Sequence, residues 1–160
     1  MKTNLVVAGA AGFAAGLAAA AAVMKLAMPA LMLSTHESKY TDVEETAAAL
    51  KTAIEAAGWH CPAVRDMNAA MSKRGVTFEP PVRIVELCKA EYAKEILTDN
   101  PEISTLMPCA WGVYKKDGKV YITGMNTGLM GKLFGGTIAR VMGGSVADDE
   151  RKILSAVVRR

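Results

Sequence analysis

The sequence predicts an α+β fold, with a single antiparallel sheet backed by helices and preceded by one N-terminal transmembrane helix. Residues 5–24 are apolar without a break, which is typical of a membrane span. Apolar residues alternate on both sides of an Asp-Gly pair at 117–118, which predicts a β-hairpin. Apolar spacings of three and four residues after position 41 predict an amphipathic helix. We therefore expect an anchor at 1–33 and one α+β domain at 34–160.

The anchor prediction rests on the charge and length of the first segment. Residues 1–33 carry only two charged side chains, Lys2 and Lys25. As a helix, Leu5–Met24 would cover the roughly 30 Å of bilayer hydrocarbon at about 1.5 Å per residue. A cleaved secretory signal is the alternative, but the run is long for one and stays apolar after Lys25. We expect a retained single-pass anchor in the cytoplasmic (inner) membrane, with the domain on the periplasmic or extracellular side.

The anchor also contains a pair of glycines with a helix-packing spacing. Gly12 and Gly16 form GxxxG, which lets two helices approach closely in lipid. The sequence favours two interpretations equally: contact with a second copy or another membrane subunit, and a chance spacing in an alanine-rich span. The membrane itself is the first expected partner.

The charge balance argues against nucleic-acid binding. The formal net charge is +3, and Lys2 and Lys25 supply two of those charges, so the remainder of the chain is close to neutral. Aromatic residues are few and are not interleaved with arginines.

The first half of the domain is predicted to contain a strand within 31–40 and a helix from Thr41 to Gly58. Thr41 and Glu44 form a capping box, and the glycine follows as a stop. One apolar stripe of this helix should face the core: Val43, Ala47, Leu50, Ile54 and Ala57.

Four further elements are predicted before the hairpin. Residues 59–67 should be extended because a proline interrupts them, and a short helix follows at 68–75. A strand at 82–88 leads into a helix at 89–100, which ends before Pro101.

The hairpin lies within Leu106–Asn126, and its two-residue turn predicts the register. Trp111 should face Gly124, which leaves room for the indole, and Val113 should face Ile122. Lys116 should likewise pair with Lys119 and Tyr114 with Tyr121. The apolar face of the hairpin carries Cys109, Trp111, Val113 and Ile122.

The C-terminal part is predicted to be helical. A glycine-punctuated helix at 126–144 should stop at Gly143-Gly144, and a last short helix at 148–158 carries acids in its first turn. The apolar stripe of the first of these helices usually would be core, but it could instead lie on a membrane or partner surface. The stripe consists of Leu129, Leu133, Phe134, Ile138 and Met142.

Three segments together resemble a known family. They are "AAGW" at the end of the first helix, "GVTFEPPVRIVELCKAEYAKEIL" and "LMPCAWGVYKKDGKVYITGMN". From Leu33 to Val157 the chain resembles the domain of unknown function 302 family. The resemblance implies a small α+β domain, often exported or membrane-attached in bacteria and archaea, without established catalytic residues. Family members often carry Asn-Pro after the first cysteine of this pattern, whereas Lys89 and Ala90 follow Cys88 here.

The three cysteines, Cys61, Cys88 and Cys109, include no CxxC, so neither a zinc ribbon nor covalent haem attachment is indicated. Cys88 ends one strand and Cys109 begins another. If those strands are antiparallel neighbours, the Cβ atoms could approach to about 4 Å and a disulfide could form. A reactive or ligating pair and two inert buried thiols are the alternatives. The apolar neighbours of Cys109 should raise the pKa of its thiol, which argues against a nucleophile.

His60 and Cys61 are adjacent, and on an extended segment they would point to opposite faces. One of them could join Cys88 or Cys109, with Met107 or Met125 completing a soft copper or haem site. The favoured interpretation is a surface histidine beside a packed thiol. The residues by themselves identify no cofactor.

The leading hypothesis is therefore a membrane-anchored, externally facing accessory or ligand-binding domain without evident catalysis. It would serve as a subunit of a redox or sulfur-handling membrane assembly. The alternative is a thiol- or metal-based redox protein that uses Cys88 and Cys109. A small-molecule enzyme with a pocket between sheet and helices is a weaker third hypothesis, because no catalytic set of residues can be identified.

Overall fold

The structure is a computed structural model that describes residues 24–25, 27–28 and 30–159. The chain divides into two units, Met1–Met32 and Leu33–Arg160. Residues 5–23 of the predicted anchor, with Gly12 and Gly16, lie outside the described residues. Within the described ranges, no helix has both the length and the apolar character needed to cross a bilayer.

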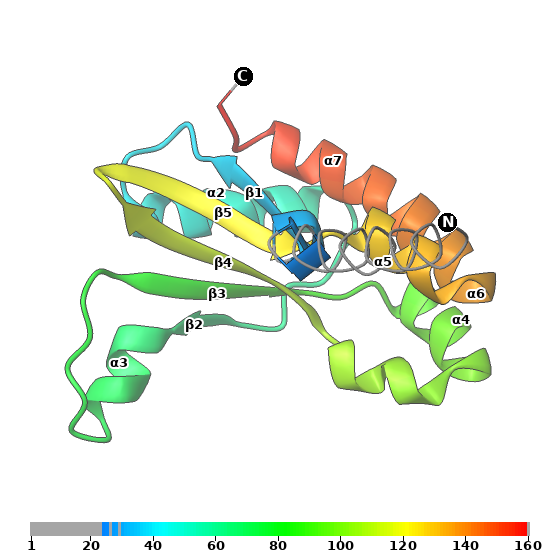
Figure 1. Ribbon diagram of the computed structural model, residues 1–160. Coiled ribbons are helices and arrows are strands. Elements are labelled where there is room, and N and C mark those ends of the chain that lie inside the picture. The colour runs from blue at the N-terminus through cyan, green and yellow to red at the C-terminus, as the bar shows by residue number, and fades with distance from the viewer. Residues whose placement is uncertain (1–23, 26, 29, 160) are drawn as a thin grey trace, which may run out of the picture. The chain divides into compact units, whose positions relative to one another are not determined.

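The second unit is built on a five-stranded sheet with the strand order β1-β5-β4-β3-β2 (Figure 1). Every neighbouring pair is antiparallel, as predicted. The strands are β1 (Leu33–Glu37), β2 (Val64–Asp66), β3 (Val82–Leu87), β4 (Cys109–Lys116) and β5 (Lys119–Met125).

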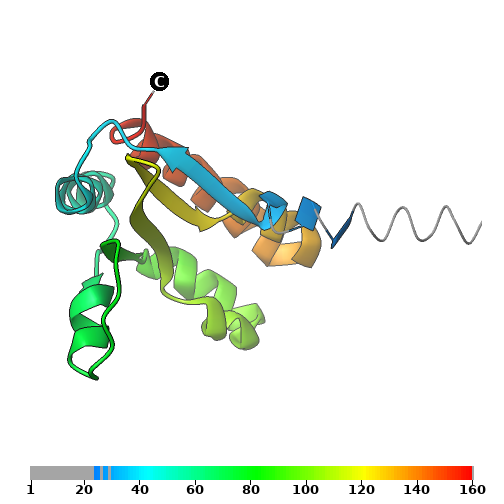
Figure 2. The same cartoon turned by 60° about the vertical axis from the view of Figure 1, so that its left-hand side comes forward.

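Helices connect and cover the strands, which confirms the α+β prediction for this unit. They are α2 (Val43–Ala56), α3 (Met67–Ser72), α4 (Ala90–Asp99), the 3-10 helix η1 (Pro101–Leu106), α5 (Thr127–Phe134), α6 (Gly136–Arg140), the π-helix η2 (Val141–Val146) and α7 (Ala147–Ser155). Helix α7 runs alongside β1 and β5, as Figures 1 and 2 both show.

The β4–β5 hairpin has the predicted register at all the predicted pairs, including Trp111 with Gly124 and Val113 with Ile122. At the turn, Asp117 and Gly118 both have positive φ, at 50° and 76°. A Cβ placed on Gly124 would lie 2.0 Å from Cδ1 of Trp111. The glycine is therefore required because the indole occupies the space that a side chain would take.

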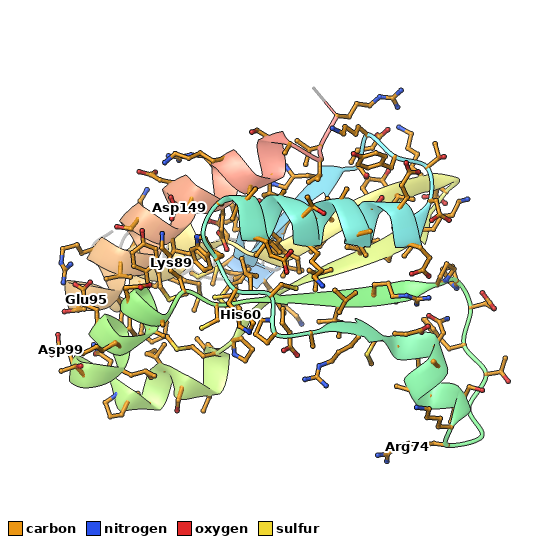
Figure 3. The ribbon with its side chains drawn as sticks, turned by 180° about the vertical axis from the view of Figure 1, so that it is seen from behind. His60, Arg74, Lys89, Glu95, Asp99 and Asp149 are labelled. Carbon is orange, nitrogen blue, oxygen red and sulfur yellow. The ribbon has the colours of Figure 1, made fainter. Side chains whose placement is uncertain are left out.

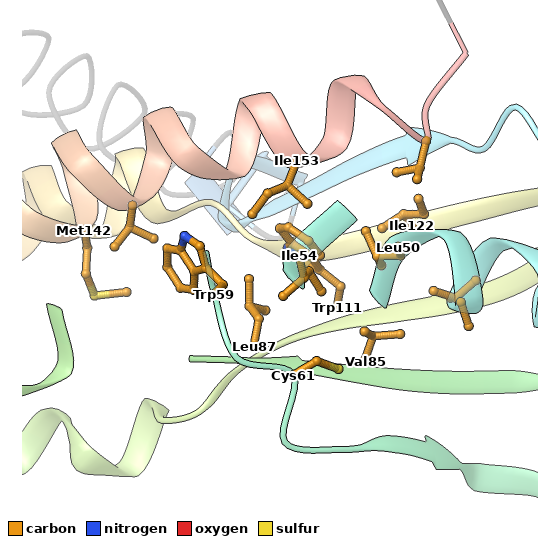
Figure 4. Close-up of a cluster of buried hydrophobic side chains, with 14 of the residues drawn as sticks. Leu50, Ile54, Trp59, Cys61, Val85, Leu87, Trp111, Ile122, Met142 and Ile153 are labelled. Carbon is orange, nitrogen blue, oxygen red and sulfur yellow. The ribbon is translucent and has the colours of Figure 1, made fainter. Parts of the chain in front are cut away.

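One face of the sheet forms the core with the helices. Alternate residues of β3, β4 and β5 are buried on this face, as expected for an antiparallel sheet covered on one side. They pack against the apolar stripe of α2 and against α7, and Figure 4 shows this cluster. Its fully buried members include Leu50, Ile54, Val85, Leu87, Val113, Ile122 and Ile153.

The start of α2 differs from the prediction by one residue. Asp42, not Thr41, is the N-cap, and its carboxylate accepts a hydrogen bond from the Glu45 backbone N–H at 2.9 Å. Glu44 takes no part in a capping box, because its carboxylate pairs with Arg83 on β3. The Thr41 prediction was wrong because Asp42 offers an equally good cap one position later, nearer the first buried residue.

The predicted helix at 126–144 does not end at Gly143-Gly144. The chain breaks at Gly135, where φ is +73°, and then continues through α6 and the π-helix η2 directly into α7. A Cβ on Gly131 would lie 2.6 Å from the backbone of Gly143. The glycines of η2 thus permit close helix packing instead of stopping a helix.

The predicted apolar stripe of this region divides between core and surface. Ile138 and Met142 are buried, whereas Leu133 and Phe134 are exposed. Leu129 is half-buried. The stripe was predicted for one continuous helix. The break at Gly135 separates α5 from α6, so the helical spacing does not continue across it, and this explains the division.

Candidate functional site

An apolar pocket, here called the inner pocket, lies where β3 ends and β4 begins. Helices α4, η1 and η2 form its walls, and its lining is almost entirely apolar. The empty volume is about 400 Å³ with the mouth included, but little of it is open to a water molecule. Side chains must therefore shift before anything larger than one or two waters can enter. The lining includes Leu87, Cys88, Tyr92, Met107, Cys109 and Met142.

The structure brings together Cys88, Cys109 and Met107, three of the residues that the sequence singled out. Burial, with smaller contributions from the nearby Glu150 and Cys88, raises the pKa of the Cys109 thiol to about 12. At neutral pH this thiol is almost wholly protonated, so it is a poor nucleophile. The prediction that apolar neighbours blunt its reactivity agrees with this shift.

All three cysteines are free thiols. The register pairs Cys109 with Leu87, so Cys88 lies one position beyond the residue directly opposite Cys109. Because a strand alternates its side chains between faces, this offset works against a short approach of the two Cβ atoms. The disulfide alternative is not realised in this structure.

His60 and Cys61 do not line the inner pocket. His60 is exposed and pairs through its backbone with Cys88, whereas Cys61 is buried. This is the surface histidine and packed thiol that the sequence favoured. Within the described part of the chain, no three His, Cys, Asp or Glu side chains are grouped so that they could hold a metal ion.

A charged and aromatic cluster closes one side of the inner pocket. The Lys89 ammonium lies 4.6 Å from the ring centre of Tyr92 and 5.8 Å from that of Trp59. It also donates to Asp149 Oδ2 at 3.1 Å, and the Trp59 indole and the Tyr92 hydroxyl each donate to the same oxygen at 3.2 Å. Figure 3 shows Lys89 and Asp149 side by side between α4 and α7.

Asp149 joins this cluster together, a role that the sequence analysis missed. Its carboxylate was interpreted as a helix-start acid, but η2 leads into α7 in helical conformation, so no free helix start exists there. Burial opposes its ionisation, yet hydrogen bonds from Lys89 and Trp59 outweigh burial and lower the pKa of Asp149. The cluster thus ties α4 to α7 at the edge of the pocket.

The model of the family described as domain of unknown function DUF302 matches residues 34–159. The chain belongs to the DUF302 family. A crystal structure of an uncharacterized conserved DUF302 protein from Bacillus stearothermophilus is similar in fold, with a TM-score of 0.69 and 17% identity. That similarity covers 79% of this chain and 98% of the other. No curated protein matches the chain.

The DUF302 domain also has a larger, more polar hollow, and residues 106–109 line both this hollow and the inner pocket. Its lining includes Trp111, Gly124, Thr127 and Glu150. Glu150 is only 8% exposed, and burial raises the pKa of its carboxyl to about 7, although a hydrogen bond from Thr127 opposes this. No sequence signal identifies this residue, because an acid near a helix start is common and the strands that surround it are distant in the chain.

Proposed function

We propose that this DUF302 chain is an accessory domain that binds a small apolar molecule in the inner pocket and is tethered to a membrane by residues 1–33. The ligand-binding part of the proposal rests on one observation: an almost entirely apolar pocket lies at the end of the sheet, framed by three separate helices. Binding sites for small molecules are typically concave and mostly apolar.

The chemistry of the walls favours a polarisable ligand. Four sulfur atoms line the pocket, from Cys88, Met107, Cys109 and Met142. Sulfur is soft and polarisable, and methionine side chains adapt their shape to what they contact. Because the pocket is narrow without a ligand, we infer that shifts of these methionines open it for a flat aromatic or similarly compact apolar molecule.

The thiol-redox alternative is less well supported. A thiol with a pKa of about 12 supplies little thiolate at neutral pH, and thiolate is the form that attacks a disulfide or binds a metal. Cys109 therefore acts in this proposal as an apolar wall residue.

Methionine methyl groups offer a direct test of ligand binding. The full chain, labelled with ¹³C at the methionine methyls, would be titrated with toluene while NMR shifts are recorded. The signals of Met107 and Met142 should move, and that of Met71 on α3, which lies outside the pocket lining, should not.

A matched pair of variants on α4 localises the response. Ala93 lines the pocket, whereas Ala90 on the same helix is exposed. Ala93→Leu should fill the space and abolish the toluene shifts, and Ala90→Leu should leave them unchanged. Equal responses from the two variants, or no shift in the original chain, would refute the inner pocket as a ligand site.

The tether and the accessory role rest on the composition of Leu5–Met24. We expect the expressed chain to remain in the membrane fraction after an alkaline carbonate wash, and to co-purify with other membrane proteins after extraction in mild detergent. Recovery in the soluble fraction would overturn the tether, and a lone monomer after gentle extraction would count against the accessory role.

A further inference from the structure

A second cleft, here called the acidic cleft, lies between α7 and the ends of β1 and β5. Three adjoining hollows make it up, and Glu150 and Met125 line all three. The two larger hollows have empty volumes of about 980 and 860 Å³ with their mouths included, about twice that of the inner pocket. The cleft is therefore roomy enough for a small molecule without rearrangement.

Glu150 places a carboxyl group in the wall of this cleft without a cationic partner. Its Oε2 accepts a hydrogen bond from the Thr127 hydroxyl at 2.6 Å. Across the described residues, no ion pair involves Glu150, although its neighbours Asp148 and Asp149 are both paired. A buried carboxyl without a countercharge is costly to ionise, and a cation beside it would relieve that cost.

Trp111 supplies a second unused polar group in the same wall. The residue is 3% exposed, and the Nε1 edge of its indole lies over Gly124, which lines the cleft with it. In the described part of the chain, the indole N–H of Trp111 has no hydrogen-bond acceptor, whereas that of Trp59 donates to Asp149. Among the described residues, every fully enclosed side-chain nitrogen or oxygen has a hydrogen-bond partner, so this unpartnered N–H is reached by solvent in the cleft, where a ligand atom can accept its hydrogen bond.

We propose that the acidic cleft binds a small organic ammonium ion, whose charged nitrogen pairs with Glu150 and whose neighbouring oxygen accepts a hydrogen bond from Trp111. The hydroxyls of Thr127 and Ser34 line the same cleft and can accept hydrogen bonds from the remaining ammonium N–H groups.

The charges around Glu150 favour a cation over an anion. The other charged or titratable groups that line the cleft are His36 on β1, Cys109 at the start of β4 and Arg151 on α7. Arg151 is largely exposed and pairs with Asp148, and the His36 ring nitrogen shares a hydrogen bond with Ser34 at 2.8 Å. Among the described residues, neither group contacts Glu150, so the carboxyl remains the dominant charge deep in the cleft.

Ethanolamine is the probe for this proposal, because it carries an ammonium and an adjacent hydroxyl. Calorimetric titration of the full chain at pH 8 should detect ethanolamine, whereas ethylene glycol and glycolate at the same concentrations should not bind. In the methionine-labelled chain, the Met125 signal should shift. Binding of glycolate in preference to ethanolamine would overturn the proposal, since it would mean that protonated Glu150 donates to an anion.

Two conservative variants separate the roles of the wall residues. Glu150→Gln keeps the shape but removes the charge, and it should weaken ethanolamine binding at least tenfold. Glu91→Gln, at an exposed acid on α4, is the matched control and should change nothing. Trp111→Phe should weaken ethanolamine several-fold but leave ethylamine, which has no oxygen, unaffected. Unchanged affinity in Glu150→Gln would refute the site.

The pH dependence provides a further check. Because the pKa of Glu150 is about 7, its ionised fraction falls about tenfold between pH 8 and pH 6, and ethanolamine affinity should fall in proportion. His36→Gln should retain this dependence and Glu150→Gln should lose it. Toluene shifts at Met107 and Met142 should persist in Glu150→Gln, so failure of this proposal is distinguishable from failure of the inner pocket.

Discussion

The β4–β5 hairpin and the helical run Thr127–Ser155 both depend on glycine, but in different ways. In the hairpin, Gly118 supplies a positive φ at the turn, and its place is evident from the adjacent aspartate. In the helical run, Gly131 and Gly143 allow two helices to approach, and that role depends on residues brought together by folding. The role of glycine can therefore be predicted from neighbouring residues in the hairpin, whereas in the helical run it depends on contacts between residues that are distant in the chain.

Local residues determine the hairpin turn but not the role of a glycine inside a helix. A hairpin turn restricts its own backbone, so the register follows from a few neighbouring residues. A glycine inside a helix lowers helix propensity and resembles a stop, unless a contact elsewhere requires its small size. Gly143 was read as a stop for that reason.

The largest expected effect is in the hairpin. Gly124→Ala would place a Cβ 2.0 Å from the Trp111 ring, a clash that forces the indole out of its site. We expect a loss of about 3 kcal/mol or more in unfolding free energy, measured by urea denaturation. Gly112→Ala in the same hairpin is the control, because its Cβ would meet only a backbone oxygen at 3.8 Å. Similar stability of both variants would contradict the close Trp111–Gly124 packing.

The next effect concerns the buried acid of the helical run. Because the pKa of Glu150 rises from 4.5 to about 7 on folding, the native state holds its proton more tightly between these values. The contribution of this raised pKa to the unfolding free energy is fully present below pH 4.5. It is lost as the pH rises through 7, a change of about 3 kcal/mol in total. The unfolding free energy of Glu150→Gln, measured by urea denaturation, should therefore rise relative to that of the original chain by about this amount between pH 4.5 and pH 8. A difference that does not vary with pH would contradict the buried, unpaired carboxyl.

The smallest effect tests the close helix approach. Gly131→Ala would place a Cβ 2.6 Å from backbone atoms of Gly143, which cannot rotate away as a side chain can. We expect a loss of about 2 kcal/mol in unfolding free energy. Gly144→Ala, where a Cβ meets nothing within 4 Å, should be neutral or slightly stabilising because alanine favours helix. If Gly144→Ala destabilised the protein more than Gly131→Ala, the helical run would not depend on the close approach of Gly131 and Gly143, and its difference from the hairpin would not hold.

Much of the fold was predictable from local pattern. The strand pairs of the hairpin, the buried face of α2 and the end of α4 before Pro101 all follow from spacings within about 15 residues. The strand order could not be predicted in the same way. The pairing of β1 with β5 joins residues almost ninety positions apart, as the Thr35–Thr123 hydrogen bond illustrates, and no local signal encodes it.

The candidate sites were predictable only in part. Sulfur chemistry drew attention to Cys88, Cys109 and Met107, and these residues do line one pocket. Glu150 and Asp149 escaped notice because acids near the start of a predicted helix have an ordinary explanation. Their roles come from what surrounds them, which is Thr127 for one and Lys89, Trp59 and Tyr92 for the other.

Residue order alone was enough to establish the α+β class, the hairpin register and the place of Gly124 opposite Trp111, since these depend on turn geometry and two-residue alternation. Folding in three dimensions decided the strand order, the continuous path through η2 into α7 and the two clefts. The physical reason is that burial and electrostatic environment depend on distant segments. A carboxyl such as that of Glu150 acquires its pKa from the walls around it, and those walls exist only in the folded chain.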